Sequence, residues 1–275
     1  MIKVDGIILV LSCHKHRDTR LVQYKLPKDD YGNWKVIYVI GDLFLDSDYK
    51  LEGNLMTIKC EDSYLHLLKK LTLSLKYLYE IFDIKEGVLR SGDDLVFNEG
   101  ILQCFLENPK ICEVSNGNGN TNTLIELDFL GKSHVNKSLL SHEISDDDIK
   151  TAVEDTYMLQ YYNDHQEDFN NPLHNLKDVD LSKYIKRPRL PIIPSGVLYY
   201  ISNKSCNILI NHMSNINFNI FHYDEYSSSY PYTIEDCGVA FILYYNKISF
   251  INCARLYNDY HYHEAVMAVH TNMNK

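Results

Sequence analysis

The sequence contains no Cys-x-x-Cys pair and no excess of positive charge, and each absence excludes a class of protein. Without cysteines at that spacing, neither a zinc knuckle nor a dithiol redox site is indicated. The odd number of 7 cysteines argues against a disulfide framework. The formal net charge of −10 argues against a nucleic-acid-binding protein, because such proteins present a basic face.

Long apolar segments are absent as well. The apolar run at residues 7–11 is far too short to cross a bilayer, and no leader-like segment precedes it. We therefore expect a cytoplasmic protein with no transmembrane segment. What the sequence does contain is ordinary for a globular chain: 275 residues, of which 45% are hydrophobic and 23% charged. That length is enough to bury a large core.

The first third of the sequence alternates apolar runs with one strongly periodic segment. Leucines and tyrosines recur at helical spacing from Tyr64 to Tyr79, and Asp62-Ser63 before them predicts an N-cap. Strands are predicted at 7–11, 34–40 and 55–59, and from Val88 toward Asp93. This rhythm predicts an α/β fold with a mostly parallel sheet and helices on both faces.

The rest of the sequence divides less clearly. Apolar runs at 196–202 and 239–245 predict two further strands. Ser145 before three aspartates predicts a helix N-cap whose acids complement the helix dipole, in preference to a metal site. We expect a single domain in three parts, at 1–107, 108–187 and 188–275, of which the middle part is an insertion.

Two adjacent carboxylates, Asp93 and Asp94, follow the predicted strand at Val88-Leu89. Ligands of open α/β sheets bind beyond the carboxyl ends of the strands. Mg²⁺ and Mn²⁺ take carboxylate oxygens and accept substrate phosphates as further ligands. A divalent cation that bridges a diphosphate is therefore one interpretation of this pair, and a solvated turn is the other.

Five segments, in the same order, resemble motifs of the β1,3-galactosyltransferase and Fringe-like glycosyltransferases. The metal motif of that family resembles Arg90-Ser91-Gly92-Asp93-Asp94-Leu95-Val96-Phe97-Asn98. The other four are Asp62-Ser63-Tyr64 with Lys70; Pro191 with Ser195, Gly196, Tyr199 and Ser202; Glu235-Asp236-Cys237-Gly238; and Met267-Ala268-Val269-His270. The resemblance also takes in the opening strand with Arg17 and Arg20, and it leaves out most of 108–187. It implies that 1–107 is a nucleotide-binding half, 108–187 an acceptor-side insertion and 188–275 an acceptor and catalytic half.

The resemblance implies a GT-A-like, Rossmann-type mixed sheet and inverting sugar transfer from a UDP-sugar donor to a glycan or protein acceptor, with Mn²⁺ or Mg²⁺ as cofactor. It implies that Asp94 and His270 bind the metal, with His261 and His263 as alternatives to His270. Asp46-Ser47-Asp48 is a weaker candidate for the metal site. Asp236 is the implied general base, with Glu235 as the alternative. The implied nucleotide or donor contacts are Arg17, Arg20, Lys70, Asp93 and Gly196.

One position departs from the family pattern. Gly92 stands where the first aspartate of the metal motif is expected, which puts the donor contact and the strength of metal binding in question. A catalytically silent relative that binds sugar nucleotides or glycans is therefore the alternative to an enzyme. A phosphohydrolase is less favoured, because no second carboxylate cluster follows another strand.

Overall fold

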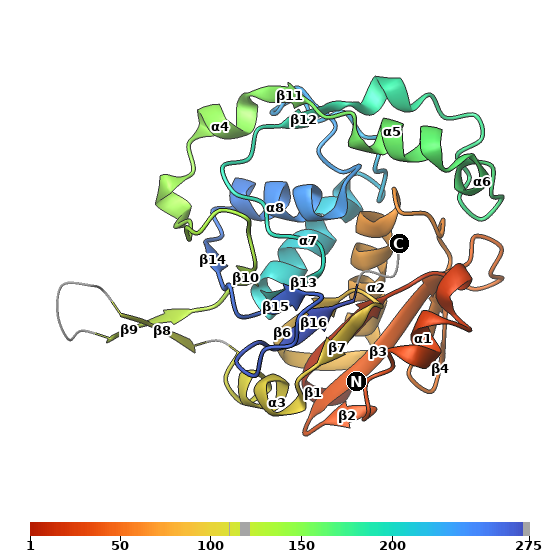
Figure 1. Cartoon of the computed structure of the whole chain (residues 1–275). Coiled ribbons are helices and arrows are strands. Elements are labelled where there is room, and N and C mark those ends of the chain that lie inside the picture. The colour runs from red at the N-terminus through yellow and green to blue at the C-terminus, as the bar shows by residue number, and fades with distance from the viewer. Residues whose placement is uncertain (110, 116–121, 272–275) are drawn as a thin grey trace.

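Four parallel strands form the centre of a nine-stranded sheet (Figure 1). The computed structural model describes residues 1–109, 111–115 and 122–271. The parallel strands are β1 (Ile2–Leu11), β3 (Trp34–Gly41), β5 (Leu55–Ile58) and β6 (Phe82–Ser91). Their order in space is β6-β1-β3-β5, so β1 lies between two parallel neighbours.

Antiparallel pairings extend this centre on both sides. Beyond β6 the sheet continues with β13 (Leu198–Ser202), β10 (Phe129–Gly131) and β14 (Phe250–Asn252). At the other side β4 (Tyr49–Glu52) pairs with β5, and β2 (Asp30–Tyr31) pairs with β3. The expected mixed α/β sheet flanked by helices is confirmed. The prediction of a mostly parallel sheet is wrong, because four of the eight strand pairings are antiparallel.

Both faces of the sheet are covered, and β1 shows this most simply. Ile7, Leu9 and Leu11 join one hydrophobic cluster, while Ile8 and Val10 join the other, as expected when successive side chains point to opposite faces. The first face is covered by α2 (Leu67–Ile81), α7 (Asn203–Asn215) and α8 (Glu235–Tyr245). The second is covered by α3 (Glu99–Glu107) and a small sheet of β7 (Leu95–Phe97), β15 (Tyr257–Asp259) and β16 (Ala268–His270).

The strand predicted at 239–245 is wrong, because this segment is the greater part of α8. Residues Val239 to Tyr244 are all buried. A short apolar run fits a buried helix as well as a buried strand, and periodicity alone does not separate the two. Gly238 lets α8 approach α2, since a Cβ there would lie 2.6 Å from Leu68 Cδ2.

Of the two N-caps that the sequence predicted, one is wrong and one is confirmed. Asp62-Ser63 does not cap α2, whose N-cap is His66. Asn98 caps α3 by accepting from the Ile101 N–H, and Ser145 caps α4 (Asp146–Lys150) by accepting from the Asp148 N–H. The three aspartates after Ser145 therefore belong to a helix start, as predicted.

The middle segment 108–187 is not a separable insertion. It supplies β10 to the main sheet, and its residues Ile149, Met158 and Tyr162 belong to the hydrophobic cluster under α2, α7 and α8. Besides β10 and α4, this segment contains β8 (Ile111–Ser115), β9 (Asn122–Glu126), η2 (Ser141–Glu143), β11 (Ala152–Glu154), α5 (Tyr157–Asp164), α6 (Gln166–Phe169), η3 (Leu181–Tyr184) and the start of β12 (Lys186–Pro188). Within the described ranges, no helix is both long and apolar enough to cross a membrane.

Candidate functional site

A cavity of about 440 Å³ lies at the carboxyl ends of β1 and β6. Ser12 follows β1, Gly92 follows β6, and Val197 immediately precedes the antiparallel strand β13. All three line the cavity, and the Gly92 N–H donates to the Val197 carbonyl at 2.9 Å. The site thus lies at the edge where open α/β sheets bind ligands.

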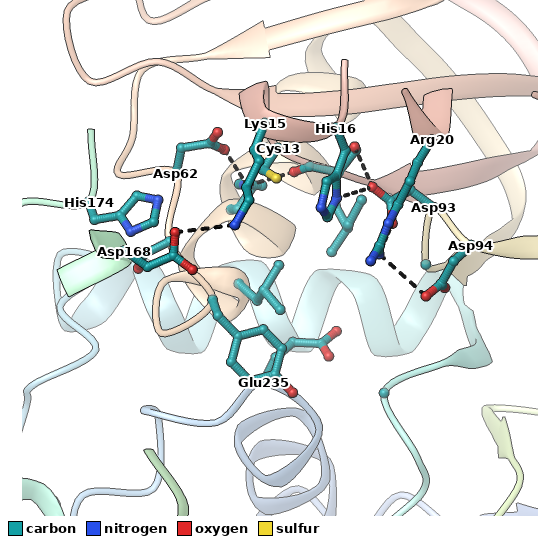
Figure 2. Close-up of a pocket in the computed structure, with 18 of the residues that line it drawn as sticks. Cys13, Lys15, His16, Arg20, Asp62, Asp93, Asp94, Asp168, His174 and Glu235 are labelled. Atoms are coloured by element: carbon teal, nitrogen blue, oxygen red, sulfur yellow. Dashed lines mark hydrogen bonds and ion pairs between the residues drawn. The ribbon is translucent and has the colours of Figure 1, made fainter. Parts of the chain in front are cut away.

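Asp93 contacts several side chains at this edge of the sheet (Figure 2). Its buried carboxylate accepts from Ser12 Oγ at 2.7 Å, pairs with His16 Nδ1 at 2.8 Å, and accepts from Arg20 Nη1 at 3.2 Å. The hydrogen bond to Asp93 is the main reason that the pKa of His16 rises to about 9. Although burial opposes it, His16 and Ser12 hold the pKa of Asp93 below its ordinary value. Asp93 is therefore an ionised residue that joins the β6 end to η1 (His14–His16) and α1 (Arg20–Gln23).

Asp94 faces His270, which comes from the other end of the chain. Strand β16 pairs with β7 and sets His270 opposite Leu95, next to Asp94. His270 Nε2 lies 3.4 Å from Asp94 Oδ2, and Arg20 Nη1 lies 3.4 Å from the same oxygen. The other ring nitrogen of His270 is 2.9 Å from Asp259 Oδ1. Asp94, followed by Asp259, raises the pKa of His270.

The Asp94–His270 pair fits a divalent cation in two respects. Ligands that share an ion with bonds of about 2.1 Å lie roughly 3 Å apart, close to the observed 3.4 Å. In addition, the Asp259 carboxylate contacts Nδ1 of His270, the ring nitrogen that does not face Asp94, and so orients the imidazole, as carboxylates do for metal-binding histidines. A metal ion would bind the unprotonated form of the His270 ring nitrogen. In the described part of the chain, no group of three or more His, Cys, Asp or Glu side chains could hold a metal, so a ligand would have to supply the remaining donors.

Glu235, the first residue of α8, has a structural role. Its carboxylate pairs with Arg90 of β6, with Arg90 Nε 3.0 Å from Oε1 and Nη2 3.2 Å from Oε2. The Tyr199 hydroxyl donates to the same carboxylate in a short hydrogen bond. Burial opposes the charge on Arg90, but Glu235 raises the pKa of this guanidinium, which stays cationic. Because all its oxygens are engaged, Glu235 is a poor general base.

Asp236 differs from Glu235 in that its carboxylate is only half-buried and lines the cavity. Its oxygens accept from the Gly196 N–H at 3.1 Å and the Cys237 N–H at 2.8 Å. Burial raises the pKa of Asp236 above its ordinary value. A side chain in place of Gly196 would be crowded, since a Cβ there would lie 3.0 Å from Glu235 Oε2 and 3.5 Å from Asp236 Oδ2. The backbone at Gly196 therefore lies close to the start of α8.

Lys70, which the resemblance implied as a nucleotide contact, is buried and paired with a carboxylate in the structure. Its buried ammonium donates to Asp62 Oδ1 at 2.5 Å and to the Ser12 carbonyl at 2.8 Å. Asp62 also accepts from the His14 N–H at 2.6 Å and the Gly41 N–H at 2.8 Å. Asp62 therefore ties the ends of β1 and β3 to α2, which explains why it does not serve as an N-cap.

His66, the N-cap residue of α2, gives a prediction about the effect of pH on stability. Burial lowers the pKa of His66 to about 4, and its Nδ1 lies 2.6 Å from Ser63 Oγ. An unfolded His66 takes up a proton near its ordinary pKa of about 6.5. Between these values the unfolded state holds more protons, so the free energy of unfolding should fall as the pH drops from 6.5 to 4. Urea unfolding at several pH values checks this. In His66→Gln the slope over that range should be smaller, and an unchanged slope would contradict the assignment.

The structure gathers eight of the nine predicted site residues around this one cavity. They are Arg20, Lys70, Asp93, Asp94, Gly196, Glu235, Asp236 and His270. Arg17 is exposed and does not line the cavity, so its prediction as a nucleotide contact is not supported. The alternatives for the metal site, His261, His263, Asp46 and Asp48, are all exposed and outside the cavity lining.

Several cavity residues had no predicted role. Ser12 and His16 follow the first strand, and the rule on strand ends could have identified them. The middle segment contributes Tyr161, Asp168 and His174 to the wall, and Lys15 Nζ pairs with Asp168 Oδ1 at 3.6 Å (Figure 2). No sequence signal shows that this segment reaches the cavity. The chain matches no known family model and no curated protein.

Proposed function

We propose that this chain is a metal-dependent, inverting glycosyltransferase that moves a sugar from a UDP-sugar donor to a hydroxyl of a glycan or glycoprotein. The observation that supports this is the composition of the cavity. The cavity is lined by a carboxylate–imidazole pair suited to a divalent cation, Asp94 and His270, and by a separate half-buried carboxylate, Asp236. Inverting transfer needs both groups, in separate roles.

The Asp94–His270 pair and Asp236 have different proposed roles. Asp94 and His270 would hold Mn²⁺ or Mg²⁺ together with the diphosphate of the donor. The bound ion would neutralise the diphosphate as it leaves. Arg20 lies between Asp93 and Asp94 and is placed to donate to phosphate oxygens, which guanidinium groups bind well.

Asp236 is the proposed general base. It would take the proton of the acceptor hydroxyl while that oxygen bonds to the anomeric carbon and the electron pair of the broken bond leaves with UDP. The raised pKa of Asp236 suits this role, because a base is most effective when its pKa approaches the working pH. Gly196 and Cys237 hold its carboxylate through their backbone N–H groups.

Substitution of Asp94 tests the metal assignment. Asp94→Ala should remove the Mn²⁺-dependent part of UDP affinity, by roughly 10–100-fold or more, which is the loss that even a supporting residue of a metal site causes. Asp259→Ala should cause a smaller loss, since it keeps the ligands and removes only the orientation of His270. Calorimetry of UDP binding with and without Mn²⁺ measures both effects.

The control for this experiment is Asp46→Ala, which removes an exposed aspartate of the other Asp-x-Asp sequence. It should bind UDP and Mn²⁺ like the unmodified protein. The metal assignment is wrong if Asp94→Ala also binds them normally. Loss of affinity in Asp46→Ala alone would move the metal site to the loop that contains Asp46.

A sugar-nucleotide-binding protein without transferase activity is the second candidate function. Gly92 favours it, because the structure has no carboxylate at this position and a Cβ there would already lie 3.2 Å from Asp94 Oδ1. Arg20 also contacts both aspartates, where a more acidic site would be expected for strong metal binding. Release of UDP from UDP-sugars in the presence of a range of acceptors distinguishes the two candidates.

A further inference from the structure

Arg20, the first residue of α1, contacts the carboxylate oxygen through which Asp94 would bind a metal (Figure 2). The Nη1 atom of Arg20 lies 3.4 Å from Asp94 Oδ2, and the Nε2 atom of His270 lies 3.4 Å from the same oxygen. A divalent cation held by Asp94 and His270 would thus have the Arg20 guanidinium as a direct neighbour. The two cations would share one carboxylate oxygen.

The surroundings of Arg20 determine how strongly these two cations would repel each other. The side chains of Arg20 and Asp94 are only 11% and 13% exposed, so water and salt screen their charges little. Asp93, the other carboxylate beside Arg20, already faces His16 Nδ1 at 2.8 Å. A divalent cation that arrived alone would therefore meet carboxylates that already face basic groups.

The contacts between Arg20 and the two aspartates are replaceable. The same nitrogen, Nη1, lies 3.2 Å from Asp93 Oδ1 and 3.4 Å from Asp94 Oδ2. Both distances exceed the roughly 2.7–2.9 Å of a strong charge-assisted hydrogen bond. Without Arg20, Asp93 would still pair with His16. Asp94 would still face His270. A diphosphate in the cavity could therefore attract the guanidinium without leaving either carboxylate unpaired.

We propose that Arg20 competes with the divalent cation for Asp94 until a nucleoside diphosphate binds, and that the phosphates then engage both cations. The metal would therefore bind strongly only together with the nucleotide. This inference rests on the proposed function and specifies how its donor site is regulated. A diphosphate brings the negative charge that two neighbouring cations need, and guanidinium groups bind phosphate oxygens well.

The first measurement is Mn²⁺ binding to the full chain without nucleotide, followed through the electron paramagnetic resonance signal of the free ion. The unmodified protein should bind Mn²⁺ weakly. Arg20→Gln removes the competing charge and keeps a polar side chain, so it should bind Mn²⁺ more tightly, by roughly tenfold or more. Arg20→Lys keeps the charge and should bind Mn²⁺ about as weakly as the unmodified protein.

Three further variants test whether the effect arises at Asp94. Arg20→Gln combined with Asp94→Ala should lose the gain in affinity, because the cation then lacks its carboxylate ligand. Arg20→Met is a second variant without the charge and should behave like Arg20→Gln. Arg17→Gln is the matched control, since Arg17 is an exposed arginine of the same segment and lies outside the cavity lining. It should bind Mn²⁺ like the unmodified protein.

The second measurement is calorimetry of UDP binding in the absence of metal. Here Arg20→Gln should weaken the affinity by roughly tenfold or more, because a charge-assisted hydrogen bond to the phosphates is lost. One substitution would thus shift the affinities for Mn²⁺ and for UDP in opposite directions. A folding defect would lower both affinities. The factor by which Mn²⁺ and UDP strengthen each other's binding, which is the same for both ligands, should shrink in this variant.

The inference is overturned if Arg20→Gln and Arg20→Met bind Mn²⁺ no better than the unmodified protein, or if their UDP affinity is unchanged. It is also overturned if the double variant keeps the gain, or if the unmodified protein binds Mn²⁺ equally well with and without UDP. In each of these cases, normal binding of UDP with Mn²⁺ would leave the proposed function standing. If the unmodified protein binds no UDP in the presence of Mn²⁺, the proposed function itself fails, and the role of Arg20 fails with it.

Discussion

Asp236→Asn is expected to slow sugar transfer by about 10²–10⁴-fold, which is the usual contribution of a general base. The amide has nearly the same shape as the carboxylate but cannot accept the proton of the acceptor. It keeps one of the two backbone hydrogen bonds from Gly196 and Cys237, so the free energy of unfolding should fall by only about 1 kcal/mol. The affinity for UDP and Mn²⁺ should change little. Initial rates at saturating donor and acceptor measure the effect.

The pH profile and a neighbouring variant complete this test. In the unmodified protein the rate should rise as the pH passes the raised pKa of Asp236, because only the ionised form is a base. Glu235→Gln should instead lower stability, since it removes the counter-charge of buried Arg90. A full transfer rate in Asp236→Asn would show that another group is the base.

Lys70→Met should lower the free energy of unfolding by about 3–5 kcal/mol, the usual cost of removing one partner of a buried ion pair. The substitution leaves the Asp62 carboxylate buried without its ammonium partner, although two backbone N–H groups still donate to it. Such a loss is a large part of the 5–15 kcal/mol that typically stabilises a domain. Urea unfolding monitored by circular dichroism measures it.

Lys69→Met is the matched control, because Lys69 pairs with Glu61 at 2.6 Å in a more accessible position on the same helix. Partly exposed pairs of this kind contribute about 0–1 kcal/mol. If Lys70→Met unfolds like the unmodified protein but binds UDP weakly, Lys70 is a nucleotide contact, as the sequence first suggested. Equal losses in both variants would show that burial of the pair does not matter.

The sequence was sufficient to predict where the candidate site lies in the fold, because the ends of apolar strands can be identified from local patterns. Asp93 and Asp94 follow an apolar strand, and the structure places them at the expected edge of the sheet. The resemblance further indicated His270 and Asp236, which also line the cavity. Their roles as metal ligand and base remain predictions, as do the UDP-sugar donor and the metal itself.

What could not be predicted depends on contacts between distant segments. The resemblance gave Lys70 only as a nucleotide contact, and its burial depends on pairing with Asp62 and on the Ser12 carbonyl, which lie far from it in the sequence. The apolar run of α8 fits a strand or a buried helix equally well, and packing on α2 and α7 decides between them. Nothing local to residues 157–161 indicates that they meet Tyr64.

The antiparallel strand β13 has a consequence for dividing the chain. It covers one side of β6 from Gly87 to Ser91, and its own residues are all buried. A fragment of residues 1–107 would therefore expose the backbone N–H and C=O groups of β6 as an open edge beside an apolar surface. Such edges template association between molecules. Residues 1–107 are thus not expected to behave as an independent unit in isolation, because both the edge of β6 and the cavity depend on β13 and the residues just before it, which come much later in the sequence.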